Sequence, residues 1–160
     1  MQLKWMFSFL MLTTYLLSAC SDSPYYEAQG TTEARIAEIT QHLKLPADKK
    51  SALIDGLQDA HLFEERLGDG GGLGPTDYCR YFALSVQPQA IGEWVNMLSP
   101  TPLQQAENLH YSAPAQAKNW WLSEATYKTL TMYEANALTG LAGWVGVAKT
   151  GQVYIFICTT

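Results

Sequence analysis

Apolar residues between positions 30 and 68 recur at helical spacing. The segment 32–45 repeats them at i, i+3 and i+7, which predicts a helix that ends at the Leu45-Pro46 step. A second helix is predicted from Ala47 or Asp48 to the residue before Gly68. Because the connection is so short, we expect the two helices to form an antiparallel pair. Their apolar stripes consist of Ile36, Ile39 and Leu43 in the first helix and Leu53, Leu57 and Ala60 in the second.

The period of the pattern changes to two after a glycine-rich connector at 68–75. Four segments rich in aromatic and β-branched residues predict strands, and an amphipathic stretch at 90–98 predicts one further short helix. Lys149-Thr150-Gly151 predicts a tight turn between the last two strands. We therefore expect an α+β fold, with an N-terminal helical pair followed by a roughly four-stranded antiparallel sheet. The predicted strands are 78–86, 129–135, 141–148 and 152–158.

The first nineteen residues have the layout of an export signal. Lys4 supplies a positive charge, residues 5–17 are predominantly apolar, and the small pair Ser18-Ala19 precedes Cys20. Thirteen residues are fewer than the roughly 20 that cross a bilayer as a helix. A cleaved signal peptide is therefore favoured over a permanent transmembrane helix.

The run Leu17-Ser18-Ala19-Cys20 resembles the lipobox of bacterial lipoproteins. The resemblance, which covers only the leader, implies cleavage before Cys20 and a diacylglycerol on its sulfur. Two or three acyl chains on one residue would anchor the protein stably. In that class, Ser21 after the cysteine implies the outer membrane, whereas the nearby Asp22 keeps the inner membrane open. The alternative is an ordinary signal peptide with a coincidental cysteine.

Cleavage before Cys20 would divide the chain into three parts. These are a signal peptide at 1–19, the lipidated cysteine with a flexible tether at 20–30, and a single periplasmic domain at 31–160. Loss of Lys4 would change the net charge from −5 to −6. Such a charge, without a basic patch, disfavours nonspecific binding to nucleic acid or to anionic lipid headgroups, so we expect no nucleic acid as a partner.

Cys79 and Cys158 are the two cysteines that remain after lipidation of Cys20. An even pair in an exported protein predicts a disulfide, which would close a loop of about 79 residues. The chain-entropy model assigns such a loop on the order of 4 kcal/mol. Pairing of the strand at 78–86 with the terminal strand would bring the two cysteines together. The alternative is two small buried side chains that never meet.

The sequence carries no pattern typical of a catalytic or metal centre. The three histidines belong to no zinc motif, and the glycine-rich connector lacks the Gly-Lys-Ser/Thr ending of a phosphate-binding loop. His61 and Glu65 are expected to form an exposed i,i+4 pair on the second helix. We therefore predict a non-catalytic domain without a cofactor, apart from the covalent lipid. The histidines are His42, His61 and His110.

Tryptophan and tyrosine exceed what the core of so small a domain requires. A long, proline-bearing loop at 99–119 leads into Trp120-Trp121, whose adjacent indoles should point different ways. We predict that 109–122, and especially Tyr111, Trp120 and Trp121, form a partner-binding surface. The alternative is that most of these rings fill the core.

Together these features predict an outer-membrane lipoprotein whose periplasmic domain binds an envelope protein. That partner would belong to an envelope assembly, or would be a toxin or hydrolase that the domain inhibits. An alternative is an envelope hydrolase that acts on peptidoglycan or another glycan through Glu107 and Glu124. A purely structural anchor is the third interpretation.

Overall fold

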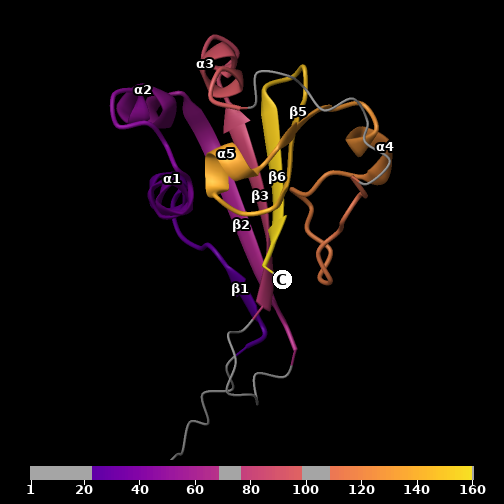
Figure 1. Ribbon diagram of the computed structural model, residues 1–160. Coiled ribbons are helices and arrows are strands. Elements are labelled where there is room, and N and C mark those ends of the chain that lie inside the picture. Colours follow the sequence, from indigo (N-terminus) through magenta and orange to yellow (C-terminus); the bar gives the residue numbers. More distant parts are fainter. Residues whose placement is uncertain (1–22, 69–76, 99–108, 160) are drawn as a thin grey trace, which may run out of the picture.

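The computed structural model describes residues 23–68, 77–98 and 109–159 and confirms the α+β class. Within these residues, six strands rather than four form one antiparallel sheet in the order β1-β2-β3-β6-β5-β4 (Figure 1). The predicted signal peptide, Cys20 and the glycine-rich connector beyond Gly68 lie outside the described residues. The strands are β1 (Tyr25–Glu27), β2 (Leu57–Leu67), β3 (Asp77–Val86), β4 (Thr131–Glu134), β5 (Gly143–Val147) and β6 (Gln152–Cys158).

The four predicted strands and the short helix after the first of them are confirmed. β3, β4, β5 and β6 lie within one or two residues of the predicted bounds, and α3 (Ile91–Val95) lies within the predicted 90–98. Gly151, in the turn between β5 and β6, has φ +91°, a conformation that glycine adopts without steric cost. Local sequence pattern therefore specifies this half of the domain.

The second predicted helix is wrong beyond Asp55. Helix α2 covers only Lys50–Asp55, and the chain continues as β2, which pairs with β3 from Leu57↔Val86 to Leu67↔Asp77. Leu62 and Phe63 point to opposite faces of β2, yet both are fully buried. A strand that is covered on both faces does not alternate cleanly between apolar and polar residues. The helical spacing of Leu53, Leu57 and Ala60 therefore wrongly indicated that the helix continues through this segment.

Residues 24–28 belong to the sheet rather than to a flexible tether. Strand β1 runs antiparallel to β2, and the main chain adds two hydrogen bonds at its ends. The Arg66 amide donates to the Pro24 carbonyl at 2.8 Å, and the Ala28 amide donates to the Leu62 carbonyl at 3.1 Å. The Tyr25 ring also stacks on Phe63 with 5.7 Å between centroids. The predicted tether at 20–30 is thus shortened, because the fold begins at Pro24.

Helices cover one face of the sheet. Helix α1 (Thr32–Ile39) begins where the Thr31 hydroxyl accepts a hydrogen bond from the Ala34 amide, and a 3₁₀ turn (Thr40–His42) follows it. Together with α2, α3 and α5 (Asn136–Thr139), it packs on the sheet to form the larger core. The fully buried side chains of this core include Ile39, Leu53, Leu62, Leu84, Trp94, Leu138 and Ile155.

The segment 109–130, which contains α4 (Glu124–Tyr127), covers the other face of the sheet. A second, mainly aromatic core forms beneath it. Glu65 of β2 attaches this segment, called the cover below, to the sheet. Its carboxylate accepts hydrogen bonds from the Tyr81 hydroxyl at 2.6 Å and from the Ala115 amide at 2.9 Å. The part of the predicted long loop that the structure describes is therefore packed on the sheet. The buried residues of this core are Phe63, Cys79, Tyr81, Trp121, Leu122, Leu130, Met132 and Trp144.

Cys79 and Cys158 lie directly opposite each other on the neighbouring strands β3 and β6. Their Sγ atoms are joined as a disulfide, between residues 79 positions apart in the sequence. No helix in the described part of the chain has the length and apolar character needed to cross a membrane.

Candidate functional site

A cleft forms where the edge of the sheet meets the start of α1 and the segment 117–120. We call it the Trp120 cleft; its volume is about 460 Å³. Side chains from four separate parts of the sequence line it, so only the folded chain assembles it. The lining residues used below are Glu27, Gly30, Arg35, His61, Lys118 and Trp120.

Trp120 is half-buried at the wall of this cleft. Its indole stacks on the His61 imidazole, with 5.2 Å between ring centroids and 9° between ring planes. The indole Nε1 donates a hydrogen bond to Glu27 Oε1 at 3.2 Å. These contacts hold the indole at the mouth of the cleft without burying it completely.

Glu27 links β1 to the segment that carries Trp120. Lys118 Nζ donates to Glu27 Oε2 at 2.8 Å and lies 4.2 Å from the centroid of the Phe63 ring. Burial raises the pKa of Glu27, but the hydrogen bonds from Lys118 and Trp120 outweigh it and bring the pKa below its ordinary value. Glu27 is therefore an ionised acceptor at neutral pH.

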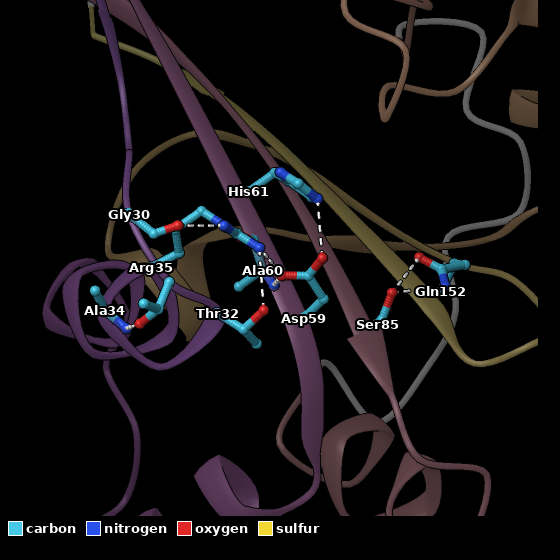
Figure 2. A network of polar contacts seen from close by, with 10 residues as sticks. Gly30, Thr32, Ala34, Arg35, Asp59, Ala60, His61, Ser85 and Gln152 are labelled. Atoms are coloured by element: carbon cyan, nitrogen blue, oxygen red, sulfur yellow. Dashed lines mark hydrogen bonds and ion pairs between the residues drawn. The ribbon is translucent and has the colours of Figure 1, made fainter.

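Arg35 of α1 closes the edge of β2 beyond the point where β1 stops. Its guanidinium donates to the Ala60 carbonyl at 3.0 Å and to the Gly30 carbonyl at 2.7 Å, as Figure 2 shows. It also donates to Asp59 Oδ1 at 2.5 Å and to the Thr32 hydroxyl at 3.2 Å. Ala60 thus receives from a side chain the donor that a longer β1 would have provided.

Asp59 completes this polar network. Its Oδ2 lies 3.2 Å from His61 Nε2, and its Oδ1 also accepts from the Ala60 amide at 2.8 Å (Figure 2). Burial raises the pKa of Asp59, but the hydrogen bonds from Arg35 and the Ala60 amide and the nearby positive charges keep it below its ordinary value. Glu27, which lines the cleft, and Asp59, which contacts the lining residues Arg35 and His61, are therefore both ionised and engaged by donors.

Tyr111 lines a different cavity, of about 400 Å³, on the same face of the sheet. Its hydroxyl donates to the Leu122 carbonyl at 2.9 Å, which fixes the ring against the cover. Trp144 also lines this cavity, and its Nε1 has no hydrogen-bond partner in the described part of the chain. The structure therefore separates Tyr111 from Trp120 instead of joining them in one surface.

Trp121 is a core residue, so its prediction as an exposed anchor is wrong. Only 9% of its surface is exposed, and its Nε1 donates to the Ser112 carbonyl at 2.9 Å. Its ring packs against Tyr81, with centroids 5.2 Å apart, and against Trp144 at 5.9 Å. The adjacent indoles were expected to point different ways on an extended backbone, but the chain turns at Asn119 and Trp120, and the two rings make an edge-to-face contact with 6.1 Å between centroids and 89° between planes.

The predicted helical pair of His61 and Glu65 is also wrong, because both residues lie in β2. Residues four apart on a strand share a face but lie too far apart to contact each other. Glu65 holds the cover through Tyr81 and Ala115, whereas His61 stacks on Trp120 in the cleft. The helical assignment of this segment concealed the role of His61.

Of the two carboxylates of the hydrolase alternative, the structure describes only Glu124. Glu124 is exposed on α4, where it pairs with Lys128 at 2.9 Å, and Glu107 lies outside the described residues. Nor do the residues that the structure describes include a group of three or more His, Cys, Asp or Glu side chains able to hold a metal ion.

No protein-family model matches the chain, and neither the curated proteins nor the solved structures include a significant match.

Proposed function

We propose that this chain is an outer-membrane lipoprotein, anchored through Cys20, whose non-catalytic periplasmic domain binds a protein partner at the Trp120 cleft. The partner is a component of an envelope assembly, or a periplasmic enzyme or toxin that the domain inhibits. The observation that carries the proposal is a partly exposed indole, held by His61 and Glu27, beside ionic groups of both signs. Tryptophan and arginine are enriched among the residues that dominate protein–protein affinity.

The state of Glu27 and of the neighbouring Asp59 favours binding over hydrolysis at the Trp120 cleft itself. Glycoside hydrolysis requires a carboxylic acid that keeps its proton, so its pKa must be raised. The pKa values of Glu27 and Asp59 are lowered instead, and Lys118 and Arg35 occupy their oxygens. Charges that are already paired and ordered can recognise a partner's polar groups at little cost in conformational entropy.

Trp120 would supply most of the affinity. A partner side chain that enters the cleft would cover the exposed part of the indole, while Lys118 and Arg35 offer donors at the rim. Loss of such an anchor costs about 2 kcal/mol or more, which corresponds to roughly a 30-fold weaker dissociation constant.

A photo-crosslinking experiment tests this proposal. A photoreactive amino acid replaces Asn119, which is exposed beside Trp120, in the full-length protein in intact cells. We expect a discrete adduct with one envelope protein that disappears when Trp120→Ala is added. The matched control places the same photoreactive residue at Lys128, which is exposed on the α4 side and lies outside the cleft.

Three results would argue against the proposal. An adduct that persists in Trp120→Ala, or forms equally from position 128, would mean that the cleft does not select the partner. Absence of any adduct from position 119 would also contradict partner binding at this site. Clearing of a peptidoglycan zymogram by the purified protein would favour the hydrolase alternative.

A further inference from the structure

The chain enters the domain at one end of the sheet. Because β1 is antiparallel to β2, its first residue, Tyr25, lies opposite Glu65 near the end of β2. The hydrogen bond from the Arg66 amide to the Pro24 carbonyl, at 2.8 Å, fixes this point of entry. In Figure 1, the start of β1 lies at the lower end of the molecule, with the lower ends of β2 and β3, whereas α2 and α3 lie at the opposite end.

Little free chain separates this entry point from the proposed lipid anchor. Only Ser21, Asp22 and Ser23 stand between Cys20 and Pro24. Four Cα–Cα steps span at most about 14 Å. The β2 strand, at about 3.3 Å per residue, is roughly 33 Å long. The connection is therefore too short for the domain to invert and stand on its α2–α3 end, which would hold Pro24 about the length of β2 away from the bilayer.

Two exposed apolar side chains lie near the end at which the chain enters, on opposite faces of the sheet, because Tyr26 pairs with Glu64 and Leu67 lies three residues further along β2. In the described part of the chain, the exposed large apolar residues are Tyr26 and Leu67, each with 47% of its surface exposed. Leu67 is the last residue of β2, and Tyr26 lies two residues after Pro24. Tyrosine is enriched at membrane–water interfaces, where its ring meets apolar surface and its hydroxyl stays in a polar environment.

The opposite end of the domain has a different surface. Lys49, the residue before α2, forms an exposed ion pair there with Glu93 of α3. Charged side chains that are paired in water gain nothing from contact with an apolar layer. The distribution of exposed side chains and the point of chain entry therefore favour the same orientation.

We infer that the domain rests on the membrane surface by the end that carries Tyr26 and Leu67, with α2 and α3 directed away from the bilayer. This inference depends on the proposed anchor at Cys20. The short connection keeps the domain end at a high local concentration near the bilayer, so two apolar side chains suffice to bias its orientation. Glu27, three residues beyond Pro24, then places the Trp120 cleft within about 25 Å of the bilayer.

Depth-dependent fluorescence quenching tests the orientation. Full-length protein purified from the envelope is reconstituted into vesicles of phosphatidylethanolamine and phosphatidylglycerol that contain a lipid with a nitroxide on its headgroup. A thiol-reactive fluorophore is attached to Leu67→Cys in one sample and to Glu93→Cys in another. The unsubstituted protein, labelled in parallel, measures any reaction of Cys79 and Cys158. We expect quenching several-fold stronger at position 67 than at position 93.

The outcomes separate the orientation from the anchor. Equal quenching at both positions, in protein that floats with the vesicles and carries acylated Cys20 by mass spectrometry, overturns the orientation but not the anchor. Protein that does not float and has an unmodified Cys20 overturns both. If Leu67→Cys fails to fold, Arg66→Cys reports on the same end, because its side chain is exposed. Stronger quenching at position 93 than at 66 or 67 would also refute the orientation.

Discussion

Replacement of Arg35 by alanine should destabilise the domain more than loss of a surface ion pair. The guanidinium donates to two backbone carbonyls, one hydroxyl and one carboxylate, and only 17% of the Arg35 side chain is exposed. Alanine leaves the Ala60 carbonyl at the edge of β2 without this donor and removes the ion pair of Asp59. The change therefore affects both the edge of the sheet and the attachment of α1.

The magnitude follows from the degree of burial. Removal of one partner from a fully buried, hydrogen-bonded ion pair costs about 3–5 kcal/mol. The Asp59 side chain is 34% exposed, so water can replace part of its lost interaction with Arg35. The loss of stability should therefore lie between that of a buried pair and that of a surface pair. We expect Arg35→Ala to lower the free energy of unfolding by about 2–3 kcal/mol. Arg35→Lys keeps the charge but lacks the planar fork, so it should lose about half as much.

Urea unfolding of the oxidised full-length protein in detergent, followed by circular dichroism, measures this loss. The control is Lys128→Ala, which removes the exposed i,i+4 pair with Glu124 and should cost less than about 0.5 kcal/mol. An Arg35→Ala protein as stable as the wild type would refute the assigned role of Arg35. An equal loss in Lys128→Ala would refute the argument from burial.

The same comparison has a predicted pH dependence. The pKa of Asp59 lies below its ordinary value of 3.8, so its ionised form stabilises the folded state. This contribution is fully present above the unfolded pKa of about 4 and is lost as the pH falls through the lower folded pKa. The ordinary pKa of an aspartate side chain is about 4. The difference in unfolding free energy between wild type and Arg35→Ala should thus be constant between about pH 5 and pH 7 and should shrink below about pH 4. A difference that grows on acidification would contradict this reasoning.

Three further predictions concern the tryptophans and the cysteines. In thermal or urea unfolding, Trp121→Ala should lose about 3–5 kcal/mol of stability because the ring is buried, whereas Trp120→Ala should lose about 1 kcal/mol. Equal losses in the two variants would contradict the assigned positions of the two rings. Alkylation without reductant should leave Cys79 and Cys158 unmodified in the mass spectrum, and modification of both would exclude the disulfide in the purified protein. Cys20→Ala should accumulate as an uncleaved, unlipidated precursor, and a protein of normal size that still partitions into detergent would refute the lipid anchor.

Local sequence pattern by itself determined much of the C-terminal half and the first helix. The alternating residues of β3 and β6 place Cys79 and Cys158 on matching faces, which is why their approach was predictable before the strand order was known. The turn at Gly151 and the helix at α3 follow from residue types within a few positions of each other. The predicted export signal rests on local composition alone, because a charged residue, an apolar run and small residues before Cys20 define it without reference to a fold.

Tertiary structure decided β1, β2 and the candidate site. Strand β1 has three residues and no pattern of its own, and β2 is buried on both faces, so its pairing partners rather than its period make it a strand. Of the cleft residues, only Trp120 was predicted. Its neighbours Glu27, Arg35 and His61 come from a strand, a helix and a second strand, and no spacing in the sequence joins them. Such a site arises when separate elements pack together, and the free energy that unites them comes from burial of the whole core rather than from any local motif.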